Sequence, residues 1–119
     1  MASITQSGRA VVLIGPVPEM NKNVPNQLIK DLLMGRKSDI HVREEDFLVR
    51  QIETIPVLNL LTSDRVKVVF PHSRLCAGGL CPAVAGGKPL YYDDNHLSHF
   101  GALTLAPMIA EAIRKSANP

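Results

Sequence analysis

The stretch Tyr91-Tyr-Asp-Asp-Asn-His-Leu-Ser-His-Phe-Gly-Ala102 places a carboxylate three residues before an imidazole, directly ahead of an apolar run with helical spacing. A Ser-His-Asp site needs a base whose tautomer is fixed by a carboxylate, so that its other ring nitrogen can take a proton from the nucleophile. Asp93 and His96 can supply this pair from one tight turn. Ser98 is the predicted N-cap of a helix over residues 99–113, because its hydroxyl can accept an orphan backbone N–H.

Two short β-branched runs predict buried strands on either side of the helical middle of the chain. Ala10–Ile14 is closed by Gly15 and a proline, and Val66–Phe70 is ended by Pro71. Continuous apolar runs of this length are typical of parallel strands that are buried on both faces. We therefore predict an α/β fold in which the carboxyl ends of these strands and the Asp93 turn share one rim, where such folds place their sites.

Helices are predicted between and after the strands. Asn23 caps a first helix that covers Gln27–Met34, and an apolar stripe at helical spacing predicts a second helix over Glu44–Leu61, packed in the core and broken at Pro56. The final helix is predicted to continue through Pro107 with an inward face made of Leu103, Ala106, Ile109, Ala110 and Ile113. Residues 1–9 are predicted to be a disordered lead, and residues 10–119 to form the domain.

Composition limits the classes of partner. The chain has 119 residues, and its 13 basic and 11 acidic side chains leave a formal net charge of +2. This charge is too small and too scattered to indicate binding to nucleic acid or to an anionic membrane. No apolar run approaches the length of a membrane span, and the start of the chain lacks the pattern of a signal peptide. We expect either a cytosolic protein or a targeting segment outside this chain.

The block Leu90–Ala102 resembles the last catalytic block of the SGNH hydrolases, an Asp-x-x-His followed by Leu-Ser and then Gly-Ala. More narrowly, it resembles the extracytoplasmic SGNH domain fused to membrane acyltransferases that O-acylate, for example O-acetylate, cell-surface polysaccharides. The similarity covers most of the chain from Ala10 onwards. It implies a three-layer flavodoxin-like parallel sheet. Since only two strands are recognisable, we expect the C-terminal half of such a domain.

The resemblance also implies which parts of the site lie elsewhere. SGNH enzymes take their nucleophilic Ser from a Gly-Asp-Ser block and their oxyanion donors from a Gly and an Asn in two further blocks, and none of these is recognisable in this chain. We expect the isolated chain to be inactive, with His96 as base and Asp93 as its orienter in the parent protein. The implied partners are a cell-surface carbohydrate and an acyl donor, with no cofactor. A membrane is contacted only through an absent N-terminal region, on the periplasmic or extracytoplasmic side.

Cys76 and Cys81 flank Ala-Gly-Gly-Leu, a loop flexible enough to close a disulfide. Free thiols and metal ligation are the alternatives, and the paired cysteines of the resembled family favour the disulfide and an oxidising compartment. A zinc site is conceivable because His72, His96 and His99 lie within the same short span, although the spacing is irregular. His72 and His99 are predicted to be surface residues.

Two functional hypotheses therefore remain. The first is the base-bearing part of an SGNH-type carbohydrate O-acyltransferase or esterase. The second is a non-catalytic or zinc-stabilised binding module that keeps the same turn for structural reasons. Asp94 competes with Asp93 for the orienting role, and the family spacing favours Asp93.

Overall fold

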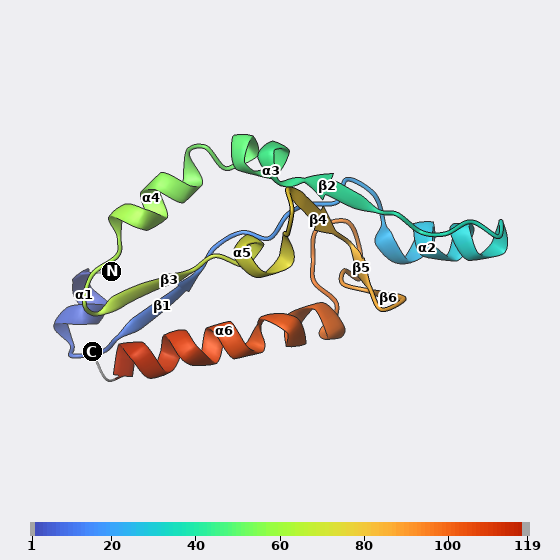
Figure 1. Cartoon of the computed structure of the whole chain (residues 1–119). Helices are drawn as coiled ribbons and strands as arrows, with labels where there is room; N and C mark the ends of the chain where they lie inside the picture. The colour runs from blue at the N-terminus through green and yellow to red at the C-terminus, as the bar shows by residue number, and fades with distance from the viewer. Residues whose placement is uncertain (1, 118–119) are drawn as a thin grey trace.

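The computed structural model describes residues 2–117, which form short helices and strands in an elongated molecule of 56 × 26 × 23 Å (Figure 1). The strands pair two by two, as β1 with β3, β2 with β4, and β5 with β6, and not as one continuous sheet. In chain order the elements are α1 (Ala2–Gln6), β1 (Val11–Ile14), α2 (Val24–Leu33), β2 (His41–Arg43), α3 (Glu44–Arg50), α4 (Thr54–Leu60), β3 (Val66–Val69), α5 (His72–Leu75), β4 (Leu80–Pro82), β5 (Val84–Ala85), β6 (Lys88–Pro89) and α6 (His99–Ala117).

The two strands predicted from the sequence form a parallel pair. Val11 of β1 lies opposite Val66 of β3, and the register continues to Ile14 opposite Val69. Helices α2, α3 and α4 lie between them in the sequence, as a parallel connection requires. Helix α6 packs against both strands (Figure 1). The α/β class is therefore confirmed, whereas the rest of a three-layer flavodoxin-like sheet is not present within residues 2–117.

The parallel pair is not buried on both faces, contrary to the prediction. Ile14 is 54% exposed and the other residues of β1 are only half-buried. Within the described residues, neither outer edge of this pair carries a further strand. Apolar side chains on other elements are also exposed, with Leu33 of α2 at 82% and Leu60 of α4 at 84%.

The principal buried cluster lies beneath the loops and not beneath the parallel strands. It joins the loop after β1 to β4 and to the residues that precede the Asp93 turn. Its members are Met20, Val24, Ile40, Cys76, Cys81, Ala83, Leu90 and Tyr91. The best-packed part of the molecule therefore supports the candidate site.

Helix α2 begins at Val24, three residues before the predicted start. Asn23 is its N-cap as predicted, since the Asn23 side chain accepts a hydrogen bond from the N–H of Asn26 at 3.0 Å. Gly35 follows the helix with a φ of +68°, a conformation that favours glycine and ends the helix.

The predicted second helix is two helices, and the break does not lie at Pro56. Residues 51–53 form a turn between α3 and α4, and Pro56 lies in the first turn of α4. A proline is tolerated there because the first backbone N–H groups of a helix have no intrahelical acceptor. The prediction that the apolar stripe packs in the core is correct for Phe47, which is buried, and wrong for Ile52, which is exposed.

Helix α6 starts at His99, as the Ser98 cap predicts, and runs to Ala117, beyond the predicted end at Ile113. Pro107 lies inside the helix and does not end it, also as predicted. No helix within residues 2–117 has both the length and the apolar character of a membrane span.

The inward face of α6 was predicted wrongly. Leu105 is buried and Met108 is half-buried, whereas most of the predicted face is exposed, namely Leu103, Ala106, Ala110 and Ile113; Ile109 is half-buried. The cause is a contact at the start of the helix, where a Cβ on Gly101 would collide with the backbone of Leu90. This close approach fixes the rotation of α6 about its own axis.

The segment before β1 contains a short helix in the structure. Helix α1 covers Ala2–Gln6, and the guanidinium of Arg65 donates a hydrogen bond to the carbonyl of Gly8 at 2.8 Å. This bond ties the segment to the turn before β3. Residue 1 lies outside the described residues, and both the disordered lead and the domain boundary at residue 9 stay predictions.

Candidate active site

The candidate catalytic residues lie on a closed turn between β6 and α6. The N–H of Tyr92 donates to the carbonyl of His96 at 3.0 Å, and the N–H of Ser98 donates to the carbonyl of Leu90 at 2.9 Å. These two bonds hold the ends of the turn together, so that its tip presents Asp93 and His96 in a fixed arrangement.

The carboxylate of Asp93 orders both the backbone of the turn and the imidazole. Its Oδ1 accepts the N–H groups of Asn95 at 2.9 Å and His96 at 2.7 Å, and its Oδ2 lies 2.8 Å from Nδ1 of His96. Burial is the largest single influence and opposes ionisation, but these hydrogen bonds and the charge of His96 outweigh it and lower the pKa of Asp93. Asp93 is therefore ionised at neutral pH.

The ionised carboxylate determines which nitrogen of His96 carries the proton. A carboxylate accepts hydrogen bonds and donates none, so Nδ1 of His96 must be the donor and Nε2 of the neutral ring the acceptor. The His96 side chain is 61% exposed, against 29% for Asp93, which leaves the imidazole accessible to a reacting group. This is the arrangement that a general base requires.

Tyr92 packs beside the imidazole of His96. Its ring stacks on that of His96, with centroids 5.4 Å apart and planes inclined by 16°. The only sequence signal for this contact is that Tyr92 lies next to Asp93. Tyr92 contacts the face of the imidazole and Asp93 contacts its Nδ1, so both restrict the orientation of the ring.

The turn is bonded to the loop that leaves the carboxyl end of β1. The N–H of Met20 donates to the carbonyl of Asp94 at 2.7 Å, and the buried hydroxyl of Tyr91 donates to the carbonyl of Pro18 at 2.7 Å. Burial raises the pKa of Tyr91, which keeps this hydroxyl protonated as a donor. The Asp93 turn is therefore bonded to the loop that follows β1, and its place on the same rim as the end of β1 stays a prediction.

Ser98 connects the turn to α6. Its hydroxyl accepts the N–H of Gly101 at 3.0 Å, which is the predicted N-cap bond, and donates to the carbonyl of Pro89 at 2.8 Å. Ser98 is thus occupied in structural hydrogen bonds on both sides.

Comparison with known families agrees with this geometry. Residues 1–111 match the family model described as SGNH domain (fused to AT3 domains), and this match includes the turn, both parallel strands and both cysteines. The chain belongs to this SGNH domain family. No curated protein and no solved structure matches it.

The cysteines of this SGNH domain form the predicted disulfide. Cys76 and Cys81 are joined with their Cα atoms 4.1 Å apart, and the bond links the end of α5 to β4 inside the buried cluster. Glu44 lies close enough to both sulfurs to suggest a metal cluster, but both sulfurs are already bonded to each other. Neither is a thiolate, so the zinc hypothesis loses its two strongest ligands.

His72 is not a simple surface residue, contrary to the prediction. Its ring lies 4.9 Å from that of Phe47 and 5.8 Å from that of Phe70, and its Nδ1 is buried without a hydrogen-bond partner among the described residues. His99 is exposed, as predicted. The two histidines therefore have different environments.

The structure brings together His96, the predicted base, and Asp93, its predicted orienter. Asp93 and not Asp94 is bonded to the imidazole of His96. Within residues 2–117, no serine hydroxyl is hydrogen-bonded to that ring. The catalytic roles of Asp93 and His96 stay predictions.

Proposed function

We propose that this SGNH domain segment supplies the base of a Ser-His-Asp site that transfers or hydrolyses acyl groups, such as acetyl, on a cell-surface carbohydrate. The observation that carries the proposal is the 2.8 Å contact between Asp93 Oδ2 and His96 Nδ1, on an exposed imidazole in a turn that is bonded to the loop after β1. His96 Nε2 takes the proton of the nucleophilic hydroxyl, and Asp93 stabilises the imidazolium that results.

The nucleophilic serine and the oxyanion donors come from a part of the parent protein outside this segment. The open edges of the β1 and β3 pair and the exposed apolar side chains support this proposal, because neighbouring strands of the same domain would cover them. The disulfide supports a location in an oxidising, extracytoplasmic compartment. The acyl donor and the attachment to a membrane belong to the parent protein.

The proposal is tested in the longer protein that contains this segment, with acyl transfer to its carbohydrate as the readout. His96→Ala is expected to reduce turnover by about 10⁴-fold or more, and Asp93→Asn by a similar or somewhat smaller factor. Asp94→Asn is the matched control, since the Asp94 side chain is not the one bonded to His96 and its carbonyl bond to Met20 survives the change. If Asp94→Asn is the most damaging of the three, the assignment of the orienting carboxylate is wrong.

The isolated chain is expected to show no esterase activity above a heat-denatured sample on an activated acetyl ester, because a base without a nucleophile lacks the covalent route. Turnover that disappears when one local serine is replaced would contradict the proposal that the nucleophile lies elsewhere. Full activity of the parent with His96→Ala would favour the alternative, a non-catalytic binding module.

A further inference from the structure

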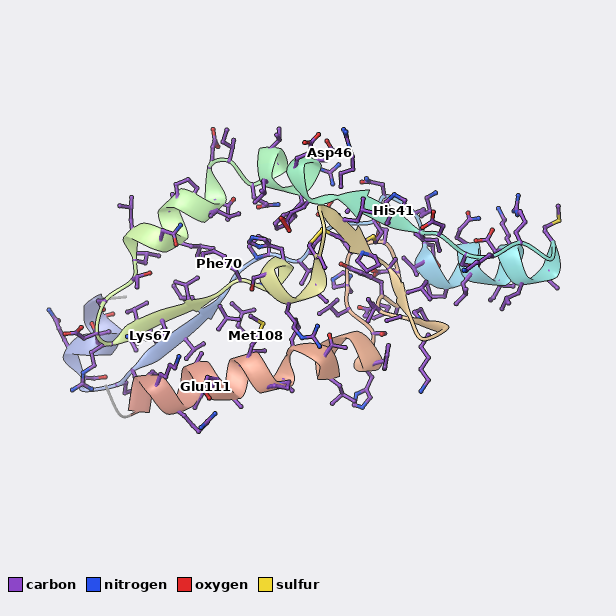
Figure 2. The ribbon with its side chains drawn as sticks, viewed as in Figure 1. His41, Asp46, Lys67, Phe70, Met108 and Glu111 are labelled. Atoms are coloured by element: carbon purple, nitrogen blue, oxygen red, sulfur yellow. A yellow bond between two sulfur atoms is a disulfide. The ribbon has the colours of Figure 1, made fainter. Side chains whose placement is uncertain are left out.

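A hollow of about 270 Å³ lies between the loop after β1, strand β2 and helix α3. Figure 2 shows two of its residues, His41 and Asp46, on the β2 and α3 side of the molecule, away from Met108 and Glu111 on α6. The polar residues that line it are Glu19, Asn21, His41, Arg43, Asp46, Arg50 and Gln51. Its volume is just below the roughly 300–1,000 Å³ typical of small-molecule sites, which suits one ring-sized ligand unit.

The formal charges that line the hollow cancel. Arg50 donates to Glu19 at 2.9 Å, and Arg43 makes a two-pronged contact with Asp46 at 3.0 and 3.1 Å. Glu45 also contacts Arg43, at 3.0 Å, although it does not line the hollow. The surroundings are therefore neutral to slightly negative, which disfavours an anionic ligand.

The same ion pairs provide many hydrogen-bonding groups in fixed positions. Guanidinium groups offer donors and carboxylates offer acceptors, and each partner holds the other in place. Both members of the Arg50 and Glu19 pair are about half exposed, so their remaining lone pairs and N–H groups can reach a ligand. Phe47, which is buried, adds an apolar wall suited to the C–H face of a ring. A neutral ligand that is rich in hydroxyl groups matches this combination.

The hollow is linked directly to the candidate active site. Asn21, at its edge, follows Met20, which is buried and whose N–H is bonded to the carbonyl of Asp94 in the catalytic turn. Asn21 itself has a φ of +63° and is the one non-glycine residue with a positive φ in residues 2–117. Asparagine tolerates this conformation better than most residues. The positive φ changes the direction of the loop at Asn21, between the bond of Met20 to the turn and the hollow.

We propose that this hollow binds one uncharged sugar unit of the carbohydrate acceptor and holds it beside the Asp93 and His96 turn. The inference rests on the proposed function for the identity of the ligand and adds where the acceptor binds and which charge class it has. Arg50 and Glu19 are binding residues, and the balance between them sets the preference for a neutral sugar.

Amide chemical shifts of the isotopically labelled chain test the proposal with three probes that share one ring: methyl glucoside, methyl glucuronide and methyl glucosaminide. The neutral glucoside is expected to bind most tightly and to shift the amides of Asn21, Val42 and Gln51. Arg50→Ala is expected to weaken its binding about tenfold or more, because hydrogen bonds to a charged group are lost. Arg114→Ala is the matched control, since Arg114 pairs with Glu111 on α6 and does not line the hollow.

A charge change tests the specificity separately. Glu19→Gln leaves Arg50 without its carboxylate partner and is expected to move the preference from the glucoside towards the glucuronide. It also keeps the proposal testable if Arg50→Ala fails to fold. The proposal is overturned if the glucuronide binds the unaltered chain most tightly, if the shifts map elsewhere, if none of the three sugars binds, or if Arg114→Ala weakens binding as much as Arg50→Ala. Binding is read without turnover, whereas the proposed function is judged by turnover of the parent protein, so each can fail alone.

Discussion

Replacing Gly101 with Ala should destabilise the protein, although alanine is the better helix former by about 1 kcal/mol. A Cβ at this position would lie 3.2 Å from Leu90 Cα and would overlap the Leu90 carbonyl oxygen. Overpacking of this kind costs about 1–3 kcal/mol, and the upper part of that range applies because the obstacle is backbone that cannot rotate away. The same carbonyl accepts the N–H of Ser98 at 2.9 Å, and a shift of α6 that relieves the overlap breaks this bond, at a further cost of about 1 kcal/mol.

The expected net loss in the free energy of unfolding for Gly101→Ala is about 2–3 kcal/mol after the gain in helix propensity is subtracted. Urea denaturation followed by helical circular dichroism measures it. Ala110→Gly, at an exposed position of the same helix, is the control and should cost only about 1 kcal/mol from propensity. If Gly101→Ala is as stable as the unaltered chain or more stable, the close approach of α6 to Leu90 is refuted.

Three further predictions concern the support of the turn. Reducing the bond between Cys76 and Cys81 should lower the free energy of unfolding by only about 2 kcal/mol, because the closed loop is short. If a thiol reagent labels the two cysteines of the folded chain without reductant, the bond is absent. Because the pKa of Asp93 is lowered in the folded protein, its contribution to stability is present above its unfolded pKa and is lost as pH falls through the folded pKa. The free energy of unfolding should therefore fall less steeply with acid in Asp93→Asn than in the unaltered chain, and identical slopes would count against the pairing with His96. Tyr91→Phe should cost about 1–3 kcal/mol, measured by denaturation, because the buried Pro18 carbonyl loses its donor; a neutral effect would show that the bond contributes nothing.

The features that the sequence predicts well are those fixed by neighbours in the chain. Asp93 and His96 are three residues apart, and Asx-type hydrogen bonds to the backbone of the same turn bring them into contact. The N-caps at Asn23 and Ser98 are equally local, since each involves a backbone N–H three residues later. The cysteine bond spans a short loop and follows the same rule.

The features that the sequence did not predict depend on distant partners. The contact of Gly101 with Leu90 sets which face of α6 is buried, and helical periodicity alone does not determine that rotation. The pair formed by Arg50 and Glu19 joins residues 31 positions apart. His72 is predicted to be a surface residue, yet its ring contacts that of Phe47, which lies 25 positions earlier in the chain.

The apolar stripes failed as predictors of burial for a different reason. A hydrophobic residue is buried only if another element covers it, and within residues 2–117 nothing covers Ile52 or Leu60. The exposure of these side chains is what the proposal of missing strands predicts.

The most direct test of the central claim is the tautomer of His96 in the neutral ring, measured from its ¹⁵N chemical shifts in the labelled chain above the titration range of histidine. The pairing with Asp93 predicts that Nδ1 carries the proton and that Nε2 is free to accept one, and it predicts that Asp93→Asn weakens this preference. A ring protonated at Nε2, or a tautomer that does not change in Asp93→Asn, would contradict the assignment of Asp93 and His96 as orienter and base.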